Sequence, residues 1–371
     1  MDQRTKCVSP HPAANHFFIK VNINYQKNIS NSQTTLPVVI ALSGLLWFLL
    51  PDASHTLSWG ECDYWMWRYV PHALTIGTWS AVASFLFSTL AVFILAELNN
   101  ANMLLRVGSR MLSSTLAIQA CLLLSFHALH PGHVLLILSM LALAPLMSSY
   151  QRPSPQLAFA TFLLLSLSSL VFPKMLWSAP LYWIMLSMLR AMSTRCLLAS
   201  VLALLIPYWL TGGVALYDGD WNSYIALLKS IIDFSSCDYG SVPVTTIVPF
   251  AYFVLLFAIG SIDFYINRYK DKTRTRMYLH AILVHGCYYT IFIALQPQHS
   301  LVLMPLLLIS SSIMYGHYFT LTQTKQSHVL NIVLLVMGVA VIVFQYDIPI
   351  AQYADTTLST IQQWIHSISF L

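Results

Sequence analysis

The chain has 371 residues, of which 57% are hydrophobic and only 8% are charged, and its mean hydropathy is +0.67. Soluble domains carry roughly 25% charged residues, so this composition excludes a water-soluble globular protein and indicates an integral membrane protein. The formal net charge of +5 comes mostly from cations between apolar segments, where cations set topology, and it does not indicate a nucleic-acid partner.

The predicted elements begin after a polar N-terminal segment, residues 1–35, which lacks the apolar core of a secretory signal peptide. Apolar stretches follow at about 36–50, 74–96, 111–129, 133–149, 157–173, 175–192, 196–212, 244–264, 277–295, 300–319 and 328–346. Several are shorter than the roughly 20 residues that a helix needs to cross the hydrocarbon core, so we expect some short connections to dip into the interface. The sequence predicts an all-α polytopic membrane protein with about 11 transmembrane helices.

Lys and Arg residues mark alternate connections between these stretches. With the N-terminus inside and the C-terminus outside, fifteen of the eighteen cations lie on the cytoplasmic side, and only Arg68, Lys174 and Lys229 lie outside. Cationic loops are hard to translocate and stay cytoplasmic, and the loop 266–276 alone carries five cations. Nine of the thirteen carboxylates fall on the opposite, external face. Two external loops are long enough to build a site, 51–73 and 213–243.

The first external loop sets two carboxylates, Glu61 and Asp63, among Trp and Tyr residues, with Asp52 at its start. One interpretation is an interfacial helix with an aromatic belt, because Trp and Tyr concentrate at the headgroup level. The other is that Glu61 or Asp63 is a general base or metal ligand that meets a lipid-linked substrate at the interface. We treat these three residues as candidate catalytic residues, with the cytoplasmic Asp271 as the control carboxylate.

The second external loop contains Asp218 and Asp220 on either side of a glycine. Such a pair can bind a divalent cation through oxygen ligands, and it is also an ordinary turn composition. No other cofactor is indicated by the sequence. The three histidines at 127, 130 and 133 offer a second metal hypothesis, but a proline and a glycine interrupt their spacing, so we expect them to form a hydrogen-bonded loop.

Two of the six cysteines, Cys62 and Cys237, fall in the external loops. An oxidising compartment permits a disulfide between them, and two unpaired interfacial thiols are the alternative.

The chain divides into the N-terminal segment 1–35, a membrane domain 36–346 and a C-terminal segment 347–371. In the last segment the apolar residues recur at helical spacing: Ile350, Ala354, Leu358, Ile361, Ile365 and Ile368. This pattern predicts an amphipathic helix that lies along the outer interface or packs on the bundle or another subunit.

Two segments carry a resemblance to a known family. One contains Ser168-Ser-Leu-Val-Phe-Pro173, then Ser193 to Arg195, then Leu204-Leu-Ile-Pro-Tyr208, and the other is Leu98 to Arg110, with asparagines before a cationic loop. Over residues 36–212 the chain resembles an uncharacterised family of multi-pass inner-membrane proteins of Bacteroidota. The resemblance implies a bacterial inner-membrane location and carries over no catalytic residues.

The order of spans and loops also looks like that of the all-helical glycosyltransferases that use lipid-linked sugars. They too follow the first span with a long external loop that contains acidic residues; here Cys62 separates Glu61 from Asp63 where those enzymes have adjacent acids. The likeness implies glycosyl or related group transfer on a polyprenyl-linked substrate at the external face. The alternative is a non-enzymatic membrane subunit or scaffold of an envelope assembly or transport complex, with a membrane protein as partner.

Overall fold

The computed structural model describes residues 29–30, 32, 34–49, 66–67, 70–71, 74, 77–234 and 242–345. Within these residues the regular structure is helical, without β-strands. The α-helices are α2 (Thr35–Leu49), α4 (Gly77–Asn102), α5 (Met111–Leu122), α6 (Pro131–Ser148), α7 (Pro155–Val171), α8 (Ala179–Met188), α9 (Thr194–Asp218), α10 (Trp221–Ile232), α11 (Val244–Asn267), α12 (Thr273–Leu295), α13 (Ser300–Leu321) and a final helix, Lys325–Gln345. Four 3-10 helices join them: η4 (Leu124–His127), η5 (Pro173–Ser178), η6 (Arg268–Lys270) and η7 (Pro297–His299).

All eleven apolar stretches predicted from the sequence contain a helix. Among the described residues, seven helical segments are long and apolar enough to cross a membrane: α4, α6, α9, α11 with η6, α12, η7 with α13, and the final helix. The chain is therefore a multi-pass helical membrane protein. The count of eleven spans and the orientation in the membrane stay predictions.

Two of the eleven stretches are broken rather than continuous helices. The stretch 111–129 divides into α5, which has 12 residues, and η4, and the stretch 175–192 contains the end of η5 and α8, which has 10 residues. At about 1.5 Å per residue, α5 is about 18 Å long, less than the hydrocarbon core of about 30 Å. Both α5 and α8 are too short to cross a bilayer alone. Neighbouring helices must therefore shield the residues at their ends from lipid.

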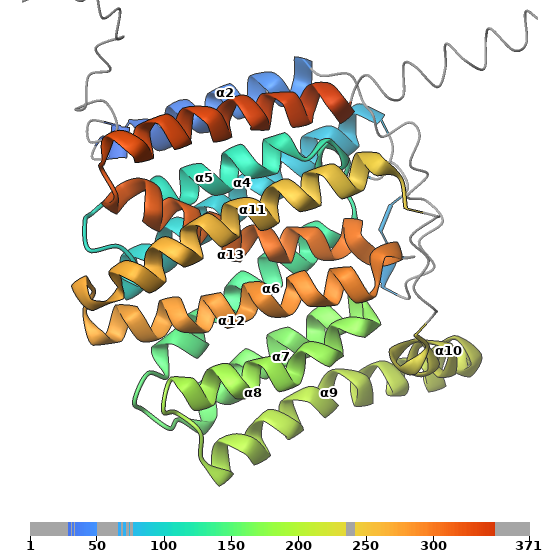
Figure 1. Cartoon of the computed structure of the whole chain (residues 1–371). Coiled ribbons are helices and arrows are strands. Elements are labelled where there is room, and N and C mark those ends of the chain that lie inside the picture. The colour runs from blue at the N-terminus through green and yellow to red at the C-terminus, as the bar shows by residue number, and fades with distance from the viewer. Residues whose placement is uncertain are drawn as a thin grey trace, which may run out of the picture.

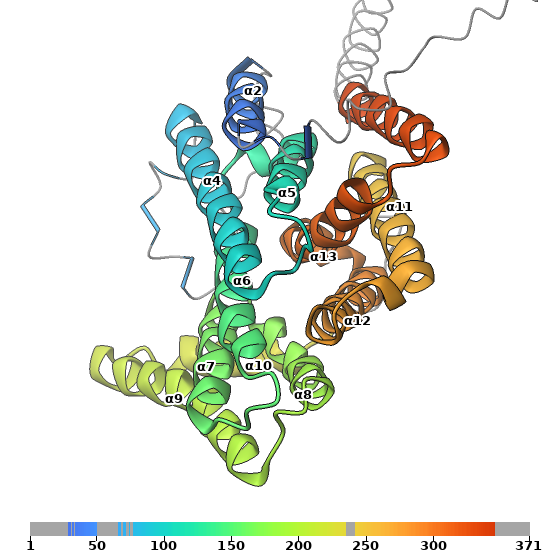
Figure 2. The ribbon, with the colours of Figure 1, turned by 90° about the vertical axis from the view of Figure 1, so that its left-hand side faces the viewer.

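The centre of the bundle is α13, which packs against α5, α6, α11 and α12 (Figure 2). Nearly all of its side chains are buried, including three consecutive serines at 310–312. Glycines allow the closest approaches: a Cβ atom at Gly260 of α11 would collide with the backbone of Met314 in α13. Small residues at such contacts let helix backbones pack closely where lipid supplies no hydrophobic driving force.

The helices run side by side, so the connections gather at two ends of the molecule (Figure 1). One end, here called the cationic end, holds the connections 103–110, 149–154, 189–193, 268–272 and 322–324. The other, the α10 end, holds η5, η7 and α10, which lies beside the end of α9 and packs on η5. The described part of the predicted external loop 213–243 is thus largely helical, because α9 continues to Asp218 and α10 follows.

Candidate functional site

Most of the candidate residues of the external loops lie outside the described residues. These are the three acidic residues of the first loop and the two cysteines of the predicted disulfide: Asp52, Glu61, Asp63, Cys62 and Cys237. The predicted C-terminal helix 347–371 also lies outside the described residues. Their roles stay predictions.

Asp218 and Asp220 lie on the tight turn between α9 and α10. Gly219 has a positive φ of 73°, a backbone conformation that glycine adopts without strain. Asp220 is the N-cap of α10, and its Oδ1 accepts a hydrogen bond of 3.4 Å from the Ser223 N–H. Among the described residues no group of three His, Cys, Asp or Glu side chains could hold a metal ion. Asp220 therefore caps α10, Asp218 is the last residue of α9, and binding of a divalent cation by this pair stays a prediction.

The helix α10 is amphipathic and packs on the bundle with one face. Leu227 is its one fully buried residue and forms a small core with Leu170 and Tyr208. The hydroxyl of Tyr224 donates to the Tyr208 carbonyl oxygen at 3.1 Å, and the Trp177 indole donates to the Ile231 carbonyl oxygen at 2.9 Å. An amphipathic helix with this arrangement is typical of the membrane interface.

Between α10, α9 and α8 the surface is hollowed into an apolar groove of about 1040 Å³. Its lining is aliphatic and aromatic: Leu176, Trp177, Ala179, Pro180, Trp183, Val201, Leu202, Leu204, Leu205, Ile206, Tyr208, Trp209, Tyr224, Leu228 and Ile231. Trp209 is 77% exposed, so the groove opens away from the bundle. We call it the α10 groove; its volume and apolar lining suit a hydrocarbon chain.

A buried cation lies beside this groove. Lys174 belongs to η5, as do the lining residues Leu176 and Trp177. Its ammonium lies 5.4 Å from the ring centre of Phe234, and the same ring contacts Trp177 edge-on at 5.2 Å. The Phe234 ring therefore contacts both the Lys174 ammonium and Trp177, which lines the groove.

Lys174 also contacts a histidine from a distant part of the chain. Its Nζ donates to Nε2 of His299 at 2.7 Å, which requires the imidazole to be neutral with its proton on Nδ1. Burial lowers the pKa of Lys174, and the negative charge of Asp233 opposes that shift. An ammonium that has lost much of its hydration is a strong donor to an anion such as phosphate.

The structure does not bring Lys174 together with Asp218 and Asp220. Those carboxylates lie at the N-terminal end of α10, and Phe234, against which Lys174 packs, follows its C-terminal end. The 12 residues of α10 span about 18 Å. A cation held by the aspartates would therefore act at a different place from a group bound by Lys174.

The sequence pattern predicts Lys174 only as one of three external cations and assigns no role to His299. The two residues are 125 positions apart, so no spacing in the sequence relates them. A weak signal was present, since Lys174 is a cation directly between two apolar stretches, where a charge is costly unless it has a partner.

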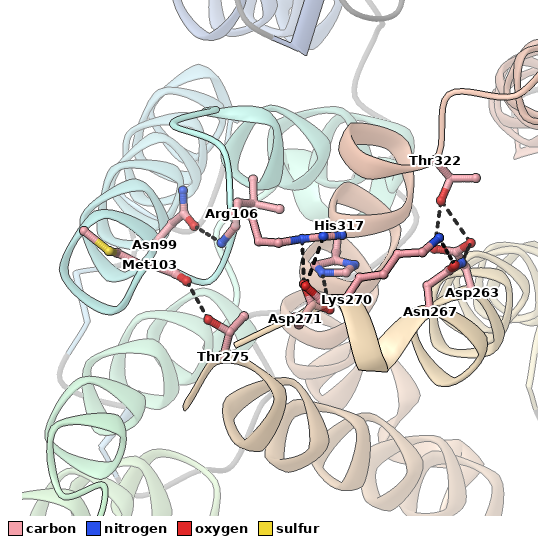
Figure 3. Close-up of polar contacts among 11 residues, drawn as sticks. Asn99, Met103, Arg106, Asp263, Asn267, Lys270, Asp271, Thr275, His317 and Thr322 are labelled. Carbon is pink, nitrogen blue, oxygen red and sulfur yellow. Dashed lines mark hydrogen bonds and ion pairs between the residues drawn. The ribbon is translucent and has the colours of Figure 1, made fainter. Parts of the chain in front are cut away.

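A second polar cluster lies at the cationic end (Figure 3). The Arg106 guanidinium pairs with Asp271 through Nε and Oδ1 at 2.8 Å, and Nε2 of His317 lies 3.4 Å from Oδ2. Arg106 also donates to the Lys270 carbonyl oxygen at 3.1 Å. The Asp271 side chain is fully buried, whereas that of Arg106 is 31% exposed. These contacts connect the α4–α5 connection, the α11–α12 connection and the end of α13.

Neighbouring hydrogen bonds extend this cluster in both directions (Figure 3). The Thr275 hydroxyl donates to the Met103 carbonyl oxygen at 3.1 Å, and the Thr322 hydroxyl donates to the Asp263 carboxylate at 2.9 Å. Asp271 is therefore a structural residue. Asp271 is therefore unsuitable as a control for the external carboxylates, because its loss breaks a buried ion pair, and the exposed Glu97 is the better control.

The histidines at 127, 130 and 133 do come together at the α10 end, where they are buried. The His127 ring stacks on Trp47 with centroids 4.1 Å apart, and the His133 ring stacks on Phe126 at 3.8 Å. His130 is the N-cap of α6, and its Nδ1 accepts a hydrogen bond of 3.0 Å from the Gly132 N–H. They pack and cap the start of α6.

Comparisons with protein-family models, with curated proteins and with solved structures gave no match to this chain. The candidate site therefore rests on its own geometry: an apolar groove, an amphipathic helix and a buried lysine.

Proposed function

We propose that this protein acts in cell-envelope biogenesis in the bacterial inner membrane. It binds a polyprenyl-linked substrate at its external face and takes part in transfer of a glycosyl or related group. The observation that carries this proposal is the α10 groove with Lys174 beside it. A polyprenyl phosphate has two matching parts, a long hydrocarbon chain and an anionic phosphate.

The hydrocarbon part fits the groove because its lining offers almost no polar atoms to desolvate. A chain that enters the open groove from the bilayer leaves lipid rather than water, so van der Waals packing against the groove lining supplies the attraction. The phosphate part fits Lys174, whose ammonium has three N–H donors and spends one of them on His299. Charge-assisted hydrogen bonds are roughly twice as strong as neutral ones.

Chemistry on the bound substrate is assigned to the predicted carboxylates of the first external loop. Glu61 or Asp63 would act as the general base, with Asp52 as a further candidate. A divalent cation at Asp218 and Asp220 is part of this proposal as an optional cofactor. The alternative function is that of a non-enzymatic subunit of an envelope complex, whose external loops bind a membrane protein.

Labelling of the full-length protein by a photoreactive polyprenyl phosphate in membranes tests the proposal. Lys174→Gln should weaken labelling about tenfold, equivalent to about 1.4 kcal/mol, and Val201→Trp should weaken it by filling the groove. Lys229→Gln is the matched control, because Lys229 is an exposed lysine of α10. Equal labelling of all three variants and the parent would refute lipid-substrate binding and favour the subunit alternative.

A further inference from the structure

A second groove lies at the opposite end of the molecule, between α2 and α4. Its lining residues are Leu36, Pro37, Ile40, Ala41, Gly44, Phe85, Phe93 and Arg110, and its volume is about 530 Å³. All of them except Arg110 are apolar or glycine. The one charged residue, Arg110, is the N-cap of α5 and belongs to the cationic end.

The groove has the direction and length of a lipid acyl chain in one leaflet. On α2 it extends from Leu36 to Gly44 and on α4 from Phe93 to Phe85, a rise of eight residue steps on each helix. At about 1.5 Å per residue this is about 12 Å, close to half of a hydrocarbon core of about 30 Å. Because the two helices run side by side (Figure 2), the groove follows the helix axes and has its cation at one end.

The floor of the groove is fixed by close packing. A Cβ atom at Gly44 would lie 3.0 Å from Cζ of Phe85, so the glycine lets the Phe85 ring lie directly against α2. Trp47, one turn further along, is buried and meets Phe85 edge-on at 5.8 Å. The outer wall is open, since Phe93 is 54% exposed. A chain could thus enter from the side without moving the helices.

The charges near Arg110 favour a phosphate with a single negative charge. Among the described residues the ion pairs are those of Asp271 with Arg106 and His317, so Arg110 takes part in none of them. Glu97 is exposed and lies one helical turn beyond Phe93 on the same face of α4. Its carboxylate would repel a headgroup that carries a second anionic group.

We infer that this groove is a binding site for a diacyl phospholipid, with one acyl chain between α2 and α4 and the phosphate diester on Arg110. The charge complementarity and the length of the groove point to this occupant. A guanidinium binds phosphate oxygens through two parallel N–H donors. The site is independent of the α10 groove and of the proposed function. Its lining comes from α2, α4 and Arg110, none of which lines the α10 groove.

Native mass spectrometry of the full-length protein in mild detergent tests the site, with phosphatidylethanolamine and phosphatidylglycerol of matched acyl chains as probes. The parent should retain one molecule of either lipid, since both present a single phosphate diester. Arg110→Gln and Ala41→Trp should each weaken retention about tenfold, because the first removes the phosphate donor and the second fills the groove. Arg110→Lys should retain part of the binding, since its charge stays but the paired donors are lost.

Two variants serve as matched controls, and neither should change lipid retention. Arg152→Gln removes another exposed arginine of the cationic end, and Val214→Trp adds an indole to an exposed position of α9. Equal retention in the parent and in both groove variants would overturn the inference. An equal loss in Arg152→Gln and Arg110→Gln would also overturn it, because it would show attraction to the cationic end as a whole.

Discussion

The buried ion pair at the cationic end gives the sharpest test of the packing. Asp271 has a fully buried carboxylate, whereas its partner Arg106 keeps 31% of its side chain exposed and has a second acceptor, the Lys270 carbonyl oxygen at 3.1 Å. Removing one partner of a buried pair typically costs about 3–5 kcal/mol, because the other charge is left uncompensated. The two possible deletions should therefore have unequal effects.

Arg106→Ala should cost about 3–5 kcal/mol of unfolding free energy, since it leaves a buried carboxylate with only His317 beside it. Asp271→Asn should cost less, about 1.5–3 kcal/mol, the usual range for a hydrogen bond to a charged group. In this variant the Arg106 guanidinium stays partly exposed to water and keeps its hydrogen bond to the Lys270 carbonyl oxygen. The double variant should fall short of the sum by about 0.5–3 kcal/mol, as expected for residues in contact.

Unfolding in mixed micelles, with the denaturing detergent as titrant, measures these free energies, and Lys272→Gln in the same connection is the exposed control. Additive losses, or a larger loss for Asp271→Asn than for Arg106→Ala, would show that the burial difference between the two partners does not set the cost.

Three further predictions concern packing, topology and covalent structure. Gly260→Ala should destabilise the protein by about 1–3 kcal/mol, because the new methyl group would meet the α13 backbone, whereas Gly213→Ala in α9 meets nothing within 4 Å and should stabilise by up to about 1 kcal/mol; unfolding titrations that show the same sign for both would contradict the packing. A reporter fused after Lys272 should be active only in the cytoplasm, and alkaline phosphatase activity at that point would reverse the predicted orientation. Non-reducing mass mapping should find Cys62 joined to Cys237, and recovery of both as alkylated free thiols from quenched membranes would exclude the bridge.

The helical architecture was predictable because hydropathy and cation placement are local signals. Each apolar stretch contains a helix, and the connections that carry Arg106, Arg152, Arg190 and Arg268 gather at one end, as alternate loops must in a bundle of antiparallel spans. The breaks at Leu123 and around η5 were less predictable. At Leu123 the backbone leaves the helix inside a continuous apolar run, whereas at η5 Pro173 and Lys174 mark a boundary but do not specify a 3-10 turn.

The candidate site was only partly predictable. The pattern of α10 was available in the sequence, since Tyr224, Leu227, Leu228 and Ile231 recur at helical spacing, but the acidic turn before it suggested a loop. The contact between Lys174 and His299 depends on how η5 and η7 meet at one end of the bundle. Tertiary packing alone creates that pair, and no local pattern of residues specifies it.

The most direct test of the central claim, group transfer on a polyprenyl-linked substrate at the external face, is the pool of polyprenyl-linked intermediates in cells that carry single variants as the sole copy. Mass spectrometry of extracted lipids should show that Glu61→Gln or Asp63→Asn accumulates a precursor, because loss of a general base slows transfer about 10²- to 10⁴-fold. Glu97→Gln, at an exposed carboxylate near the C-terminal end of α4, should leave the pool unchanged. If both loop variants insert normally and give the same lipid profile as the parent, the protein is not the transferase.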